Sequence, residues 1–253
     1  MHALIFGGNC RIARAMAKLL LARSWTITSI IRNPQQAPRI LELGEGTPGS
    51  INVLYYHLAN LKTAQDAEAL FNQTGATCGV FAADRDAAKS AIAAATTLDT
   101  VSKFLMISFP ASRRSPAPLW GAKDIEDYNA ERNSYPEIGD AKIQADEYLV
   151  AMANARHMSG GGGFQAISLR PIWLTAGAGT GKVQLGKTRA PGTVAIEDVA
   201  AVAVEMLSRD DVSGWFDLLS GEAGVEEAVE GVFREVVDCI EGEDVEAMYK
   251  LAG

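Results

Sequence analysis

The sequence has few residues of the kinds that bind metal ions or form disulfide frameworks. It contains three cysteines and three histidines in 253 residues. Cys10, Cys78 and Cys239 lie far apart, no two of them form a CxxC pair, and no histidine stands at metal-ligand spacing from any of them. The sequence therefore predicts no metal site.

Positive charge is also scarce. Asp and Glu outnumber Lys and Arg by 31 to 23, which gives a formal net charge of −8 and a pI near 5.0. Binding to nucleic acid or to an anionic membrane depends on a cationic surface, so we expect neither as a partner. The expected ligand is a small molecule, and the expected state is a monomer or a homodimer.

Long apolar runs are absent as well. No stretch approaches the roughly 20 apolar residues that a helix needs to cross a bilayer. The first predicted strand begins almost at Met1, which leaves no room for a signal peptide before it. These features predict a cytoplasmic protein without a membrane span.

What the sequence does contain is a repeated order of short apolar strand and amphipathic helix. Apolar segments predict strands at 3–6, 26–31, 51–56, 79–83, 104–108, 165–170 and 215–219. Apolar residues at helical spacing predict helices that begin near residues 12 and 64, and helices at 86–97, 140–155, 197–208 and 225–239. This order is typical of the α/β class and predicts a doubly wound parallel sheet with helices on both faces. The length predicts one domain, residues 1–253.

Three segments interrupt this order. Residues 109–136 hold four prolines and predict a long loop after the fifth strand, where α/β sheets build their sites. Residues 159–164 predict a flexible turn. Residues 174–193 resemble a phosphate loop only in composition, because Lys182 is followed by Val183 rather than by Ser or Thr. We expect the loop 109–136 and the C-terminal part 171–253 to form the substrate side.

A glycine-rich turn, GGNCRIA at residues 7–13, follows the first predicted strand. A dinucleotide-binding loop uses a first glycine for a tight turn, a second where the backbone meets the pyrophosphate, and a third for helix packing. Gly7 fills the first of these positions, whereas Cys10 and Ala13 fill the second and third. The sulfur of Cys10 would project toward the phosphates, so the sequence leaves open whether binding is weak or lost.

The helix after this turn still begins with backbone amides that attract anions. The residues expected to contact a dinucleotide there are Gly7, Gly8, Asn9, Cys10, Arg11 and Ile12. The second strand ends in Arg32 and Asn33 with no acidic residue, whereas NAD-specific loops place Asp or Glu there. Arg32 and Arg11 predict a clamp for the 2′-phosphate of NADP.

Several further stretches carry a family resemblance. They are KFLMIS at 103–108, AKIQADEYL at 141–149, FQAISLRP at 164–171 and the segment 192–221, together with the first turn and the residues 13–34 that follow it. With these stretches the sequence resembles the atypical short-chain dehydrogenase/reductases, in particular their NmrA-like, NAD(P)-binding group. The resemblance covers nearly the whole chain and implies a Rossmann fold.

The resemblance also implies catalytic residues. In that family a serine after the fifth strand helps to hold the substrate carbonyl, and a Tyr-x-x-x-Lys pair moves the proton and binds the nicotinamide ribose. Ser108 and Lys142 match the serine and the lysine, but Ile138 occupies the tyrosine position. Tyr135 is a candidate replacement, although Pro136 biases its backbone away from helical geometry.

The resemblance further implies residues that border the cofactor and the substrate. The small residues Ala82 and Ala83 after the fourth strand would permit close approach of the cofactor. The residues expected to form an apolar substrate wall are Phe109, Trp120, Ile172 and Trp173. Such a wall suits an aromatic or polyketide-type metabolite, as in secondary metabolism.

Three functions remain open at this point. The first is an NADPH-dependent reductase acting on a carbonyl or conjugated double bond. The second is a non-catalytic NADP-binding regulatory protein of the NmrA type, for which loss of the tyrosine at Ile138 is the indication. The third is a cofactor-independent isomerase, cyclase or lyase, for which Cys10 is the indication.

Overall fold

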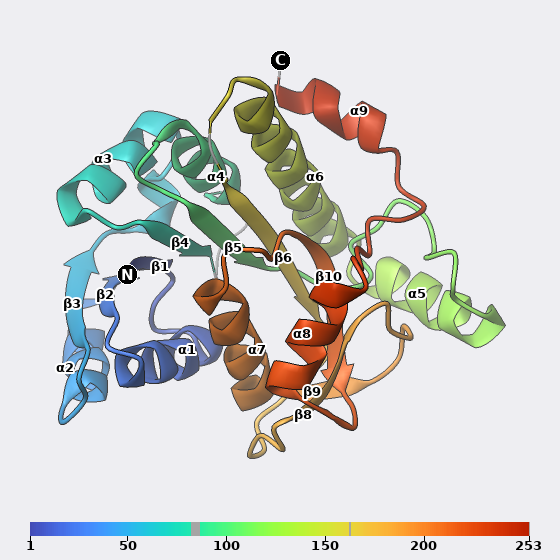
Figure 1. Ribbon diagram of the computed structural model, residues 1–253, viewed down its shortest axis with the longest axis horizontal. Coiled ribbons are helices and arrows are strands. Elements are labelled where there is room, and N and C mark those ends of the chain that lie inside the picture. The colour runs from blue at the N-terminus through green and yellow to red at the C-terminus, as the bar shows by residue number, and fades with distance from the viewer. Residues whose placement is uncertain (82–86, 162, 253) are drawn as a thin grey trace.

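A nine-stranded sheet runs through the centre of the molecule (Figure 1). The computed structural model describes residues 1–81, 87–161 and 163–252. The parallel part of the sheet consists of β1 His2–Phe6, β2 Thr26–Ile31, β3 Ser50–Tyr55, β4 Cys78–Phe81, β5 Lys103–Ile107, β6 Gln165–Pro171 and β10 Gly214–Ser220. Each of these strands lies within about two residues of a segment that the sequence predicts.

The order of the strands places a switch point beside β1. The sheet runs β11-β8-β10-β6-β5-β4-β1-β2-β3, so the chain builds outward from β1 in one direction and then returns to build in the other. Leu4 of β1 pairs in parallel register with Thr28 on one side and with Gly79 on the other. In open α/β sheets, ligands bind at the carboxyl ends of the strands at such a point.

Helices cover both faces of the sheet (Figure 1). On one face lie α1 Arg11–Ala22, α7 Ile196–Ser208 and α8 Val225–Arg234, and on the other lie α3 Ala64–Thr74, α4 Ala88–Thr97 and α6 Pro136–Met158. Helix α1 turns Ile12, Met16 and Leu20 inward, because these apolar residues recur at helical spacing. Burial of such faces on both sides confirms the predicted doubly wound α/β fold.

Two segments that the sequence predicts as irregular contain regular structure. The predicted loop 109–136 contains α5 Ala122–Ser134, which the apolar pattern missed because only Asp124 and Tyr128 of this helix are buried. The glycine-rich segment after β6 contains β7 Trp173–Thr175, β8 Lys182–Gly186 and β9 Thr193–Ala195. Strand β8 pairs antiparallel with β10 and with β11 Ala223–Gly224, and β7 pairs with β9 in a separate small sheet. The prediction of a loop over 109–136 was therefore wrong in part, and the segment 174–193 contains strands that the sequence did not predict.

Helix α6 begins earlier than predicted. It starts at Pro136 rather than near residue 140, because proline is favoured in the first turn of a helix, where its missing amide costs nothing. This start puts Ile138 and Lys142 on one continuous helix. The remaining short elements are α2 Ala37–Leu41, α9 Val245–Tyr249 and the 3-10 turns η1 Pro34–Gln36, η2 Glu42–Gly44, η3 Leu58–Asn60 and η4 Lys250–Ala252.

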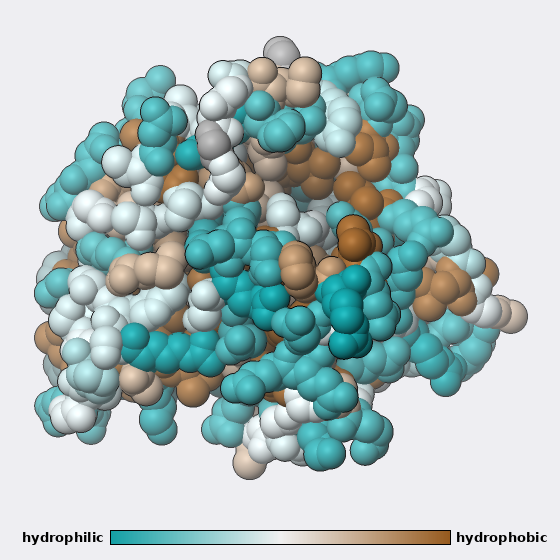
Figure 2. Space-filling view, in the orientation of Figure 1, coloured by the Kyte–Doolittle hydropathy of each residue, from teal (hydrophilic) through white to brown (hydrophobic). Residues whose placement is uncertain are grey.

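Hydrophilic residues predominate on the face shown in Figure 2. Apolar residues show through between α6 and α9 (Figure 2). Val150 of α6 packs against a buried cluster that includes Met248 of α9 and Trp215. Over the described ranges, no helix is both long enough and apolar enough to cross a membrane.

Candidate active site

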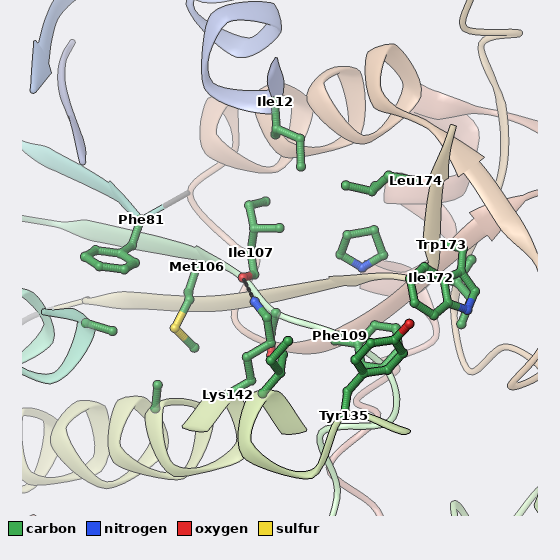
Figure 3. A pocket seen from close by; sticks show the side chains of 15 residues that line it. Ile12, Phe81, Met106, Ile107, Phe109, Tyr135, Lys142, Ile172, Trp173 and Leu174 are labelled. Carbon is green, nitrogen blue, oxygen red and sulfur yellow. Dashed lines mark hydrogen bonds between the residues drawn. The ribbon is translucent and has the colours of Figure 1, made fainter. Parts of the chain in front are cut away.

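Two cavities open at the carboxyl ends of the strands, on either side of the start of α1. The smaller, of about 450 Å³, is lined by the glycine-rich turn, the end of β2 and the segment after β3. The larger, of about 770 Å³, lies between the ends of β5 and β6 and the first turns of α6 (Figure 3). Cys10 lines the smaller cavity and Ile12 the larger, so the two cavities adjoin at the N-terminus of α1.

The glycine-rich turn keeps the geometry that the sequence predicts for its first residues. Gly7 has a φ of +76°, a conformation that residues with a side chain rarely adopt. The amide of Gly8 donates to the carbonyl of Ile30 at 2.9 Å. A Cβ atom on Gly8 would lie 1.7 Å from Oγ of Ser29, so only glycine allows this approach to β2.

Cys10 is the N-cap of α1. Its sulfur accepts a hydrogen bond from the backbone amide of Ala13 at 3.3 Å, as a serine or asparagine oxygen would at this position. Burial raises the pKa of the Cys10 thiol, while the amides of Ala13 and Ile12 and the charge of Arg14 oppose that rise. The sulfur therefore faces the amides that would otherwise be directed at a bound anion.

Two buried polar atoms near this turn have no hydrogen-bond partner within the described ranges. They are the side-chain oxygen of Asn9, which lines the smaller cavity, and Nε of Arg14 in the first turns of α1. Burying an unpaired polar atom costs roughly 1–3 kcal/mol. A ligand with a donor for Asn9 and an anionic acceptor for Arg14 would satisfy both atoms, so the residues present fit a nucleotide.

Arginine side chains gather beside the smaller cavity. Burial lowers the pKa of Arg14, and the positive charges of Arg39 and Arg11 lower it further. Arg32 lines the cavity and is exposed. Within the part of the chain that the structure describes, none of these four arginines forms an ion pair with a carboxylate. Guanidinium groups in one place attract phosphate.

The sequence predicts only part of this cluster. Arg32 lines the cavity, whereas Arg11, its expected partner, is exposed at the start of α1 and does not line it. Asn33 caps the 3-10 turn η1 by accepting from the amide of Gln35 at 2.9 Å. Sequence reasoning missed Arg14 and Arg39, because only the packing of α1 against the segment after β2 brings them together.

In the larger cavity, Ser108 follows β5 and is buried. Its hydroxyl donates to Oδ2 of Asp146 at 2.5 Å and lies 3.0 Å from the hydroxyl of Ser112. The serine therefore borders the cavity on one side and a buried carboxylate on the other. Sequence reasoning missed Asp146, although it lies one helical turn after Lys142 within the stretch AKIQADEYL.

Lys142 points into the same cavity from α6 (Figure 3). Its Nζ donates to the carbonyl oxygen of Ile107 at 3.0 Å, at the very end of β5. Burial lowers the pKa of Lys142, the charge of Asp146 opposes this shift, and Arg170 adds to it. Lys142 is thus not a solvent-facing lysine, and it lines the same cavity as Ser108.

Ile138 occupies the position of the tyrosine in the family's Tyr-x-x-x-Lys pair, and its side chain cannot donate a proton. Ile138 lies one turn before Lys142, lines the cavity and is half exposed. Tyr135 also lines the cavity, from the junction of α5 and α6, and its ring packs edge-on against Trp173 with centroids 5.7 Å apart (Figure 3). Tyr135 therefore forms part of the cavity wall beside Trp173, directly before the first residue of α6.

Aromatic and aliphatic side chains form most of the remaining wall. Phe109 packs edge-on against Trp173 with centroids 6.1 Å apart, and Ile172 and Leu174 lie beside them. Trp120 does not line the cavity, because its indole donates to the carbonyl of Thr188 at 2.9 Å within a separate buried cluster. Ala82 and Ala83 lie outside the described residues.

Comparisons with known proteins agree with this geometry. A family model described as NAD(P)H-binding matches residues 7–210. A search of curated protein sequences finds no match.

No group of three or more His, Cys, Asp or Glu side chains among the described residues is arranged to hold a metal ion.

Solved structures share the fold at low sequence identity. A putative NAD-dependent epimerase/dehydratase from Bacillus halodurans has a TM-score of 0.65 at 19% identity, over 91% of this chain and 99% of that chain. An anaerobillin reductase from Escherichia coli O157:H7 has a TM-score of 0.64 at 18% identity, over 88% and 98%. A yeast methylglyoxal/isovaleraldehyde reductase complexed with NADPH has a TM-score of 0.58 at 14% identity, over 88% and 78%.

Proposed function

Since the chain belongs to the NAD(P)H-binding family, as the resemblance to atypical short-chain dehydrogenase/reductases predicted, we propose that it is an NADPH-dependent reductase. Its substrate in this proposal is a small apolar molecule with a carbonyl group or a conjugated double bond. NADPH supplies the hydride when it is bound. The protein must then hold cofactor and substrate together and stabilise the charge that develops on the substrate oxygen.

The observation that carries this proposal is the meeting of two different cavities at the start of α1. The smaller cavity, which Cys10 lines, has Arg32 in its wall and Arg14 and Arg39 nearby. These arginines suit the adenosine end and 2′-phosphate of NADPH. The larger cavity, which Ile12 lines, contains Lys142 and apolar walls. This lining suits a nicotinamide and an apolar substrate. A dinucleotide lying across the helix N-terminus would reach both.

The walls of the larger cavity support an aromatic or other flat apolar substrate. Phe109 and Trp173 present ring edges to one another, and Ile172 and Leu174 extend the apolar surface. Among the described residues of the wall, Ser108, Tyr135 and Lys142 carry a hydroxyl or amino group. Such a lining, with a few polar groups in an apolar cavity, orients a substrate by its single polar group.

The first test is calorimetric titration of the purified protein with NADPH and with NADH. We expect NADPH to bind at least tenfold more tightly than NADH. The double substitution Arg14→Ala with Arg32→Ala should remove this preference, because it removes the partners proposed for the 2′-phosphate. Arg23→Ala is the matched control, since Arg23 lies at the other end of α1 and pairs with Glu205. Equal binding of both cofactors by the unaltered protein would contradict NADP specificity.

The second test is turnover. Loss of NADPH absorbance is followed with phenylglyoxal, menadione and a set of aromatic aldehydes and enones. We expect at least one of these carbonyl or enone compounds to be reduced.

A non-catalytic NADP-binding regulator is the second candidate function, and Ile138 in the tyrosine position favours it. This candidate predicts NADPH binding without consumption by any compound tested. A cofactor-independent enzyme, which the sulfur of Cys10 over the helix amides favours, predicts no binding of either nucleotide. The two titrations and the turnover assay thus separate the three functions.

A further inference from the structure

A buried cluster of polar side chains, centred on the carboxylate of Asp146, lies directly behind the larger cavity. Asp146 is fully buried on α6. Its Oδ2 lies 2.5 Å from Oγ of Ser108 and 3.0 Å from Oγ of Ser112, and its Oδ1 lies 2.6 Å from Oγ of Ser168. Nη1 of Arg170 lies 3.2 Å from the same Oδ2. The cluster therefore joins α6 to the ends of β5 and β6.

Ser108 is the member of this cluster that touches the cavity. Among the described residues that line the cavity, Ser108 is present, whereas Asp146, Ser112, Ser168 and Arg170 are not. A hydroxyl group both donates and accepts hydrogen bonds. Because its proton is directed at Asp146, the oxygen of Ser108 is left to face a group in the cavity. Ser108 is thus placed to pass a proton between the cavity and the buried carboxyl.

Burial favours uptake of a proton by Asp146, whereas the positive charges of Arg170 and Lys142 oppose it. Asp146 shares the guanidinium of Arg170 with a second buried carboxylate, Asp217, whose Oδ1 lies 2.9 Å from Nε. Burial and the negative charge of Asp146 raise the pKa of Asp217, while the guanidinium between the two carboxylates favours their ionised forms. Burial raises the pKa of Asp146, against the charge of Arg170 and the hydrogen bonds from Ser108 and Ser168, which lower it.

Other charged groups face the cluster from neighbouring elements. Lys142 stands one turn away on the same helix, and its positive charge lowers the pKa of Asp146. Arg113, in the segment after β5, lies close enough to influence Arg170 and Asp217. Nε of Arg113 is itself 3.5 Å from Oε1 of Glu243 in the C-terminal segment.

We propose that Ser108 and Asp146 supply the proton for reduction, in place of a tyrosine at position 138. This inference rests on the proposed reductase function. The substrate carbon gains a hydride from the reduced nicotinamide, and the carbonyl π pair moves to the oxygen. That oxygen takes the proton of Ser108, and the Ser108 oxygen takes the proton of the neutral Asp146 carboxyl. Asp146 ends as a carboxylate beside Arg170.

The arrangement in the structure corresponds to the end of this sequence, with Ser108 donating to the Asp146 carboxylate. After product release, a proton from the solvent returns to Asp146 through Ser108, by the same route in reverse. Ser108 is the catalytic residue of the pair, because it borders the cavity. Asp146 is a positioning residue that acts through Ser108, so its test needs a measurement that a structural role would not alter.

The first measurement is an infrared pH titration of the protein without cofactor or substrate. The carbonyl stretch of a neutral carboxyl group separates it from ionised carboxylates. We expect a band that titrates above the ordinary range of an aspartate and is missing in Asp146→Asn. Asp217→Asn should keep this band but move its midpoint to lower pH. In this variant Asp146 is the only carboxylate of the pair beside Arg170, so its ionised form is stabilised. Absence of any difference between the unaltered protein and Asp146→Asn would overturn the proposal.

The second measurement is the pH profile of kcat/KM for NADPH and phenylglyoxal, or for whichever probe is turned over best. The value should fall as pH rises, because the neutral acid is consumed. Ser108→Ala should lower it about 10²-fold, the lower end of what a positioned acid contributes. In Asp146→Asn the profile should be flat and low. Ser168→Ala, which removes a serine from the same carboxylate but not from the cavity, should change kcat/KM by less than roughly threefold.

Tyr135→Phe decides between this pair and the other hydroxyl in the cavity wall. The proposal expects the pH profile to survive this substitution, and its loss would overturn the proposal. Failure of the reductase function is recognised separately, by the absence of NADPH consumption in the unaltered protein. In that case the infrared titration still decides whether Asp146 holds a proton at the pH of the assay.

Discussion

At the scale of single residues, the turn at Gly7 and Cys10 shows how one substitution is accommodated. A cysteine at the N-cap supplies the hydrogen bond that α1 needs, at 3.3 Å from the amide of Ala13. The same sulfur lies where a bound phosphate would meet the helix amides. The residue therefore stabilises the helix while it competes with a ligand.

Substituting Cys10 by glycine should tighten NADPH binding about 3- to 10-fold, since the amide of Ala13 becomes available to the pyrophosphate. Glycine is a tolerated N-cap, so α1 should lose only a few tenths of a kcal/mol. Calorimetric titration measures the affinity. Cys10→Ser is the control, because it keeps the cap with a smaller atom and should bind with intermediate strength. Weaker binding by Cys10→Gly than by the unaltered protein would count against this account.

Ile138 is the second residue at which this chain departs from the family resemblance. It lines the larger cavity one turn before Lys142, so a tyrosine there would place its hydroxyl in the cavity near the lysine. Substituting Ile138 by tyrosine should raise kcat for carbonyl reduction by roughly 10- to 100-fold. Steady-state rates measure this, with Ile138→Phe as the control for size and aromatic character. Equal rates for the two variants would show that the hydroxyl contributes nothing.

At the scale of elements, β5 holds α7 in place through one buried lysine. Nζ of Lys103, on β5, donates to the carbonyls of Leu207 and Arg209 and lies 2.7 Å from Oδ1 of Asp210. These carbonyls lie at the C-terminal end of α7, where a cation is favourable. The lysine side chain is only 2% exposed, although Asp210 is largely exposed. The interaction therefore links the sheet to a helix on one of its faces.

Replacing Lys103 by methionine should lower the free energy of unfolding by about 2–4 kcal/mol, because buried carbonyls lose a charged donor. NADPH affinity should change less than about twofold, since α7 ends far from the two cavities. Urea denaturation and calorimetry measure the two quantities. Lys182→Met is the matched control at an exposed lysine, where a change within about 0.5 kcal/mol is expected. A large loss of NADPH affinity in Lys103→Met would contradict the expectation that this lysine stabilises the fold without affecting the two cavities.

At the scale of the whole molecule, buried carboxyl groups determine part of the pH dependence of stability. Burial raises the pKa of Asp217 from 3.8 to about 6, in spite of the charges of Arg170 and Arg113. Burial also raises the pKa of Asp238, against hydrogen bonds from the amides of Ile240 and Trp215. A carboxyl with a raised pKa binds more protons in the folded than in the unfolded state. Its contribution to stability is therefore present at low pH and is lost as pH rises through its folded pKa.

Asp217→Asn tests this pH dependence. The free energy of unfolding of the unaltered protein minus that of the variant should fall by about 2–3 kcal/mol between pH 4 and pH 6.5. Urea denaturation at intervals of pH gives this difference. Taking the difference removes the contribution of exposed carboxyl groups such as Asp66, whose pKa is lowered by hydrogen bonds with Thr63 and acts in the opposite direction. A difference that rises with pH would show that the pKa of Asp217 is lowered in the folded state.

The sequence predicts features that depend on neighbouring residues better than features that depend on contacts between distant segments. Strand segments, the helix after residue 64 and the turn at Gly7 follow from local periodicity and from backbone geometry, and the structure contains them. The helix α5 was missed because its few buried residues give no apolar pattern. Strand β8 was missed because its pairing with β10 comes from a distant part of the chain.

By itself the sequence determined the fold class and the tight turn at Gly7, because each depends on neighbouring residues. Only the tertiary structure decided which side chains share a cavity or a charge. The grouping of Arg14 with Arg39 and of Ser108 with Asp146 joins segments that are separate in the sequence. Packing of helices on the sheet produces these pairs, and the low dielectric between the packed elements gives them their altered proton affinities.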